Sequence, residues 1–174
     1  GVCVRPDPSD PDGHLAAVLG LGVRSVLLRL HPWEDDHRDE ERLAAALAGE
    51  GLEVGFVLPQ NRDLVRDPAR WRAKVAELGE RFRPFGSHFQ VGQAINRSKW
   101  GVWTSGEYLR LYRDAAEILR RHEGVTLLGP AVIDFELQSL LALVRRRPPG
   151  VWFDVVSSLL YVDRRGAPEA RQLG

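Results

Sequence analysis

Side chains suited to binding a polyhydroxylated ligand follow several apolar runs of the sequence. Arg29 and His31 leave one such run two residues apart, so both point to the same side of an extended backbone. Their hydrogen-bonding groups could hold a hydroxyl or a carboxylate, and the indoles of Trp100 and Trp103 could stack on the C–H face of a sugar ring. The full set of predicted ligand-binding residues is Arg29, His31, Trp33, Gln93, Asn96, Trp100, Trp103 and Tyr161.

Each of these side chains also has a structural interpretation. The two indoles could pack their loop onto the body of the domain, and Arg29 could pair with a neighbouring acid. Asp134 is better suited to cap a helix than to act as a catalyst. Glu136 then falls in the first helical turn, where a carboxylate favours the helix dipole. Glu136 is therefore only a secondary catalytic candidate.

A charged segment superficially resembles a set of metal ligands. It contains His31, Asp35, Asp36 and His37, whose spacing matches no specific metal motif. A solvated helix start explains so polar a segment more simply. We therefore predict no metal and no cofactor.

Composition excludes several classes of partner. Lys+Arg and Asp+Glu both number 24 in 174 residues, so no basic excess is present to neutralise phosphates, and we predict no nucleic-acid partner. No apolar run approaches the ~18 residues of a membrane span, so no membrane partner is predicted. Cys3 is the only cysteine, which excludes an intrachain disulfide. We expect a cytoplasmic protein whose partner is a carbohydrate, and the oligomeric state stays open.

Short apolar runs alternate with amphipathic stretches that predict helices. Helix starts are indicated by Asp10-Pro11 and Asp67-Pro68, by Asp36 or Asp39, by a capping box at Thr104–Glu107, and by Asp134. A last helix start is expected at 167–169. The predicted strands are residues 2–5, 23–30, 53–58, 88–92, 125–128 and 151–156.

Six such units predict a parallel sheet covered by helices. A doubly wound sheet should carry a glycine-rich phosphate loop after an early strand. The only nearby candidate, Gly20-Leu21-Gly22, precedes a strand instead. Polar and aromatic residues just beyond the strands favour a barrel, whose sites lie at that end. We predict an α/β fold: a TIM (β/α)8 barrel with about six βα units present.

Residues 1–174 are expected to form one incomplete domain. Six units cannot close an eight-stranded barrel, so we expect that sequence beyond Gly174 supplies the last two. The chain begins at Gly1 and contains no methionine, which indicates a piece of a longer protein.

Three segments resemble the clan A glycoside hydrolases. Residues 89–96, Phe-Gln-Val-Gly-Gln-Ala-Ile-Asn, are similar to the fourth-strand motif of that family, in which an apolar run leads to Asn-Glu. Residues 26–33 look like its second strand, and residues 153–161 like its sixth. The resemblance implies a glycosidase-type barrel with a carbohydrate at the C-terminal rim.

The sequence departs from this pattern where the family places its catalytic residues. Gln93 stands at the position of the Asn, and Ala94 at that of the acid/base Glu. A methyl group cannot protonate a leaving glycosidic oxygen. The family's nucleophile ends a seventh strand, which this chain does not reach. Ala94 could be an engineered replacement, a native residue, or a sign that the register differs and Glu136 acts instead; we favour a native alanine.

The sequence thus predicts a glycoside hydrolase-like protein that binds a carbohydrate, with hydrolysis restricted to the complete protein. The alternative is a non-catalytic carbohydrate-binding or scaffolding barrel, a pseudoenzyme of polysaccharide metabolism. A third option is a barrel enzyme without glycosidase chemistry.

Overall fold

The computed structural model describes residues 2–134 and 136–159, and its strands form one parallel sheet in the order β1-β2-β3-β4-β5-β6. Neighbours in the sequence are neighbours in the sheet, as a barrel requires and a doubly wound sheet does not. The elements are β1 (Val2–Val4), α1 (Pro11–Gly20), β2 (Ser25–Arg29), α2 (Arg38–Gly49), β3 (Glu53–Leu58), α3 (Arg62–Arg66), α4 (Pro68–Phe82), η1 (Arg83–Phe85), β4 (His88–Val91), η2 (Ser98–Trp100), α5 (Ser105–Leu119), β5 (Thr126–Ile133), α6 (Leu137–Arg146) and β6 (Val155–Leu159).

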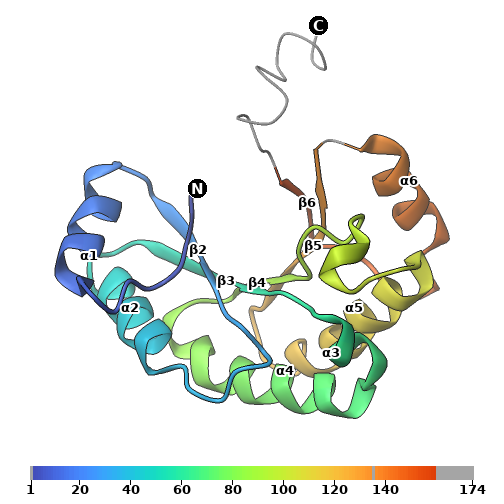
Figure 1. Ribbon diagram of the computed structural model, residues 1–174, viewed down its shortest axis with the longest axis horizontal. Coiled ribbons are helices and arrows are strands. Elements are labelled where there is room, and N and C mark those ends of the chain that lie inside the picture. Colours follow the sequence, from blue (N-terminus) through green and yellow to red (C-terminus); the bar gives the residue numbers. More distant parts are fainter. Residues whose placement is uncertain (1, 135, 160–174) are drawn as a thin grey trace, which may run out of the picture.

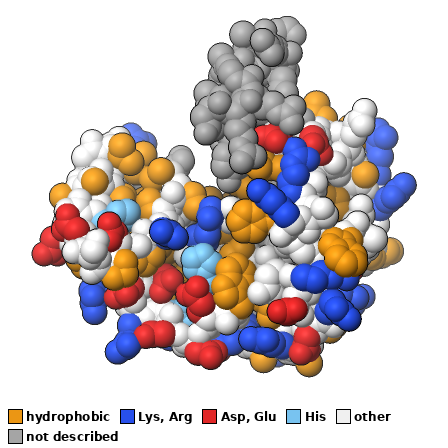
Figure 2. Space-filling model, viewed as in Figure 1, with side chains coloured by type: hydrophobic (Ala, Val, Ile, Leu, Met, Phe, Trp, Pro, Cys, Tyr) orange, Lys and Arg blue, Asp and Glu red, His pale blue; other side chains and the backbone are white. Residues whose placement is uncertain are grey.

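The strands curve into a half-barrel with the helices along its outer side (Figure 1). The predicted α/β fold, a partial (β/α)8 barrel, is thereby confirmed. No helix among residues 2–134 and 136–159 is long and apolar enough to cross a bilayer. Charged side chains of both signs are mixed over the face seen in Figure 2.

The hydrophobic core lies between the strands and the helices. Val26 and Leu28 of β2 point into it, whereas Leu27 and Arg29 alternate to the inner side of the curved sheet. On α4, residues at helical spacing are fully buried against the strands. These residues are Trp71, Val75, Leu78 and Phe82, as the periodicity predicts.

Three helix starts agree with the sequence. The side chains of Asp10 and Asp67 accept hydrogen bonds from Gly13 N and Arg70 N, and each is followed by proline. Thr104 and Glu107 form the predicted capping box. These caps satisfy backbone N–H groups that the first helical turn leaves unpaired.

Two predicted caps are wrong. The N-cap of α2 is His37; Asp36 lies one residue earlier, where its carboxylate accepts from the backbone N and the guanidinium of Arg38. The N-cap of α6 is Glu136, while Asp134 has a left-handed backbone with φ of 62° and pairs with Arg97.

The last two strands extend further along the chain than predicted. β6 begins at Val155, because a turn between Pro148 and Val151 occupies the preceding residues and Asp154 binds Arg120 and Leu127 N. β5 continues to Ile133 through a register shift between Pro130 and Val132.

Candidate functional site

The end of β2 places a positively charged group on the inner side of the sheet. Arg29 is in register with Val57 of β3, which pairs in turn with Gln90 of β4. The Nε of Arg29 is buried and makes no hydrogen bond, and no carboxylate among residues 2–134 and 136–159 forms an ion pair with it. The alternative interpretation, an internal ion pair, therefore finds no partner in this part of the chain.

His31 and Trp33 lie together just beyond β2. Their ring centroids are 5.1 Å apart, and Trp33 also packs against the core. Burial lowers the pKa of His31, because water no longer stabilises its charged form. The imidazole is thus favoured in its neutral, ligating form.

Beyond β4 the predicted residues are mostly enclosed. Gln93 is 2% exposed, and its backbone is bound by the side chain of Gln60. Ala94 is also buried and has φ of 48°, a left-handed conformation that disfavours residues other than glycine.

The side chain of Asn96 joins the loop after β4 to the end of β5. Its amide nitrogen donates to Ile133 O and to Glu136 Oε2, at 3.2 and 2.8 Å, and its oxygen accepts from Ile133 N. Arg97 forms ion pairs with Asp134 and Glu136. The hydrogen bond from Asn96, followed by those from Arg97, lowers the pKa of Glu136. Glu136 is held as a carboxylate and is poorly suited to donate a proton.

Trp103 is the most exposed indole of the predicted set, at 66%. One face of its ring is covered by the guanidinium carbon of Arg62, 3.8 Å from the centroid, and Arg62 is held by an ion pair to Glu107 at 2.8 Å. Trp100, by contrast, is partly buried in η2, where its carbonyl accepts from Gln60.

A pocket of about 480 Å³ lies beside Trp103, between the loop after β4 and helix α6. Asn96 and Trp103 both line it, so two predicted residues meet there. Its other polar side chains are neutral; they are Ser98, Thr104, Ser105, Gln138 and Ser139. Sequence reasoning missed Gln138 and Ser139, which only the packing of α6 brings to the site.

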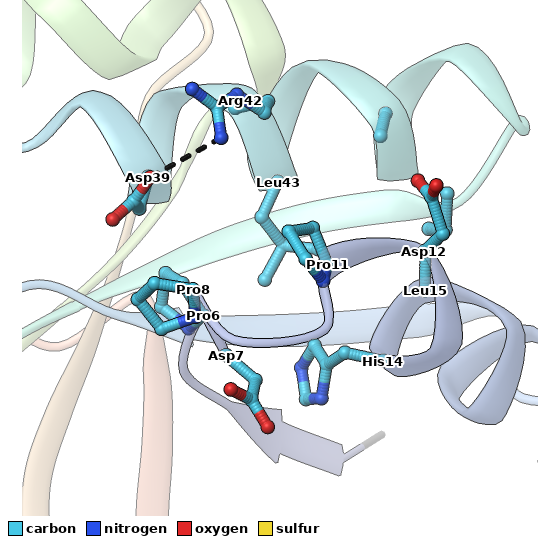
Figure 3. A pocket seen from close by; sticks show the side chains of 11 residues that line it. Pro6, Asp7, Pro8, Pro11, Asp12, His14, Leu15, Asp39, Arg42 and Leu43 are labelled. Carbon is cyan, nitrogen blue, oxygen red and sulfur yellow. Dashed lines mark hydrogen bonds and ion pairs between the residues drawn. The ribbon is translucent and has the colours of Figure 1, made fainter.

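A second pocket, of about 330 Å³, lies where β1 and β2 end, and His31 lines it. The predicted residues are thus divided between two places on the rim. A smaller neighbouring hollow lies between the loop before α1 and helix α2, where Pro6, Pro11 and Leu43 meet (Figure 3). It offers about 70 Å³, room for about two water molecules, which is too small for a sugar. Tyr161 lies outside the described residues.

Comparison with known proteins identifies the fold. No family model and no curated protein matches the chain. Among solved structures, the N-terminal domain of a putative aldolase from Bacteroides vulgatus matches with a TM-score of 0.57 and 17% identity over 92% of this chain and 48% of its own.

Two glycoside hydrolases have the same arrangement of elements. Thermotoga maritima Cel5A, solved with mannotriose, matches with a TM-score of 0.57 and 18% identity, over 86% of this chain and 51% of its own. A family 39 glycoside hydrolase from Bacteroides cellulosilyticus WH2 matches with a TM-score of 0.51 and 12% identity, over 73% of this chain and 30% of its own. The chain therefore spans about half the length of these structures or less, and it folds as a partial (β/α)8 barrel of the kind that glycoside hydrolases share.

Proposed function

We propose that this protein binds a neutral carbohydrate at the C-terminal rim of the barrel, in the pocket beside Trp103. The observation that carries the proposal is the lining of that pocket: an exposed indole together with hydroxyl and carboxamide side chains. Sugars present apolar C–H faces and hydroxyl groups, so an aromatic surface with neutral hydrogen-bonding partners suits them.

The indole of Trp103 is prepared for stacking. Arg62 occupies one of its faces, and the ion pair with Glu107 fixes that arginine, which leaves the indole in a defined orientation at low entropic cost. Ser98 and Gln138 make no side-chain hydrogen bond within the described residues, so both are free to bind hydroxyl groups. Asn96 positions the wall of the pocket, because its amide is already engaged with Ile133 and Glu136.

Hydrolysis, in this proposal, is restricted to the complete protein. Ala94 supplies no proton donor, and Glu136 is held ionised by Asn96 and Arg97. A retaining glycosidase needs two carboxyl groups about 5 Å apart. Val155 and Val156 of β6 are 43% and 54% exposed, which supports our proposal that further strands of the complete protein pack there.

The alternative function is a non-catalytic barrel that binds or scaffolds a polysaccharide. Ala94 favours it, because the residue is buried and its methyl group offers neither a proton donor nor a nucleophile. The sequence encoded beyond Gly174 distinguishes hydrolysis from non-catalytic binding, since hydrolysis requires a carboxylate at the end of a seventh strand.

Calorimetric titration with neutral oligosaccharides, including mannotriose, tests binding. Trp103→Ala and Gln138→Ala are expected to weaken the binding of any sugar that the protein takes up. Trp152→Ala is the matched control, because Trp152 is also an exposed indole covered by an arginine, Arg120 at 3.9 Å, but lies before β6 at the opposite end of the barrel. Equal losses in Trp103→Ala and Trp152→Ala, or no binding of any sugar, would refute the proposal.

A further inference from the structure

Three side chains that commonly bind metals converge at the start of α2. His31 and Glu34 come from the loop after β2, and Glu40 comes from the first turn of the helix. One ligand atom from each, an imidazole nitrogen and two carboxylate oxygens, lies within 4.8 Å of the others. Among residues 2–134 and 136–159, no other three residues of these types come so close.

The loop geometry explains why these residues meet. Glu34 N donates to His31 O at 2.8 Å, and this turn brings the carboxylate of Glu34 back over the imidazole, with Oε2 at 3.9 Å from Nδ1. Glu40 lies one helical turn beyond the His37 N-cap, which points its side chain toward the same loop.

The two carboxylates have few partners of their own. The side chain of Glu40 is only 10% exposed, yet it accepts no hydrogen bond within the described residues, and neither does that of Glu34. Glu40 is largely buried without a hydrogen bond in that part of the chain, and the negative charge of Glu34 lies beside it, so the two carboxylates repel each other. A bound cation would offset both charges.

A buried histidine, His37, lies next to Glu40 and supports the same site independently. His37 is completely buried, and neither of its ring nitrogens makes a hydrogen bond to the residues that the structure describes. Its Nδ1 is 3.9 Å from Oε2 of Glu40, so the ring is aimed at the carboxylate that borders the cluster. Carboxylates that bind a metal are themselves commonly held by a second residue, and His37 stands in the place of such a residue for Glu40.

We propose that His31, Glu34 and Glu40 bind a divalent transition-metal ion of the zinc class, with His37 as the residue that positions Glu40. An imidazole with two carboxylates suits Zn²⁺ or Mn²⁺ and disfavours Mg²⁺ and Ca²⁺, which take oxygen ligands. Bonds of about 2.0–2.2 Å place ligand atoms about 3.3 Å apart, so the glutamate side chains need only a small movement.

The charged side chains around the cluster leave it with a net negative charge. The pocket of about 330 Å³ at this point carries Asp36 and Asp39 besides the two glutamates, against two arginines, Arg5 and Arg38. Arg38 is paired with Asp36, and Asp39 with Arg42, which leaves the two glutamates facing Arg5 alone among the described residues of the pocket. Three protein ligands leave one coordination position of a tetrahedral ion open toward this pocket, as in sites that bind an exogenous ligand.

The test is calorimetric titration of ZnCl₂ into untagged protein that has been stripped with EDTA, followed by MnCl₂ and MgCl₂. We expect one equivalent of Zn²⁺, no detectable Mg²⁺ binding, and affinities at least about tenfold lower in His31→Ala and in Glu40→Gln. His122→Ala is the matched control, since His122 and Glu80 form a similar histidine–glutamate pair, 3.5 Å apart, and no described residue adds a third ligand there.

Circular dichroism and the unfolding midpoint of each metal-free variant show whether it has folded. Should Glu40→Gln unfold, Glu34→Gln, whose side chain is 49% exposed, tests the same site. The proposal is wrong if the native protein takes up no Zn²⁺, if the folded site variants bind it as well as the native protein, or if His122→Ala loses as much. Because Trp103 and its pocket lie elsewhere on the rim, failure of this test leaves carbohydrate binding untouched, and the reverse also holds.

Discussion

Gln60 and Gln93 join the ends of β3 and β4 through two reciprocal hydrogen bonds. Gln60 Nε2 donates to Gln93 O at 3.1 Å, and Gln93 N donates to Gln60 Oε1 at 3.0 Å. Gln60 Nε2 also donates to Trp100 O at 3.0 Å. Both glutamines are at most 2% exposed, so one carboxamide satisfies two buried backbone groups of Gln93 and the half-buried carbonyl of Trp100.

Gln60→Ala is therefore expected to destabilise the protein by about 2–4 kcal/mol, because it leaves buried N–H and C=O groups unpaired. Urea denaturation followed by circular dichroism measures the change. Gln138→Ala, an exposed glutamine truncated in the same way, should change stability by less than about 0.5 kcal/mol. A loss at Gln60 no larger than that at Gln138 would contradict this account.

At Ala94, by contrast, a substitution is expected to keep or raise the stability of the protein. The φ of 48° at this residue is costly for any residue with a Cβ, by roughly 1–2 kcal/mol. Ala94→Gly should leave stability unchanged or raise it by up to about 1 kcal/mol in thermal unfolding. Ala116→Gly is the control, because that buried alanine lies inside α5, where glycine costs about 1 kcal/mol. If both variants lose stability equally, the conformation at position 94 is not strained.

The carboxylate of Glu136 gives a dependence of stability on pH. Hydrogen bonds from Asn96 and Arg97 lower its pKa in the folded protein below the ordinary value of 4.5. Its contribution is therefore complete above pH 4.5 and is lost as the pH falls through the lower folded pKa. The stability difference between native protein and Glu136→Gln should shrink as the pH falls below about 4.5. A stability difference for Glu136→Gln that stays constant over this range would refute the assignment.

Periodicity was sufficient for the alternation of strands and helices, and for the caps that act within four residues. It failed where a distant side chain decides the local structure. Residues 151–156 have the apolar pattern of a strand, but pairing begins at Val155, since Asp154 is bound to Leu127 N and to Arg120. No local signal reports such contacts.

For the candidate sites, too, the sequence predicted what local signals decide and missed what distant contacts decide. The sequence could place Trp103 and Asn96 at the rim because both follow a strand. It could not show that α6 brings Gln138 to the same pocket. The sequence also indicated Asp35 and Asp36 as possible metal ligands. These residues bind Lys74 and Arg38 at the surface. Glu34 and Glu40 approach His31 instead. Which carboxylate faces inward depends on where α2 begins, and that is set by tertiary packing.

His37 connects stability with the proposed metal site. Its two buried ring nitrogens lack hydrogen bonds among the described residues, and each such group costs about 1–3 kcal/mol. His37→Leu removes both and keeps an apolar contact with Phe82, whose ring centroid is 6.2 Å away. Metal-free His37→Leu should thus unfold at the same urea concentration as the native protein or at a higher one.

The same variant, His37→Leu, should bind zinc more weakly than the native protein. Without His37 behind it, Glu40 loses its support, and the affinity for Zn²⁺ should fall about 10–100-fold in calorimetric titration. A purely structural role predicts the reverse pair of results: lower stability and unchanged zinc binding. Because the two readouts move oppositely under the two explanations, one variant decides whether this buried histidine serves packing or positions a ligand.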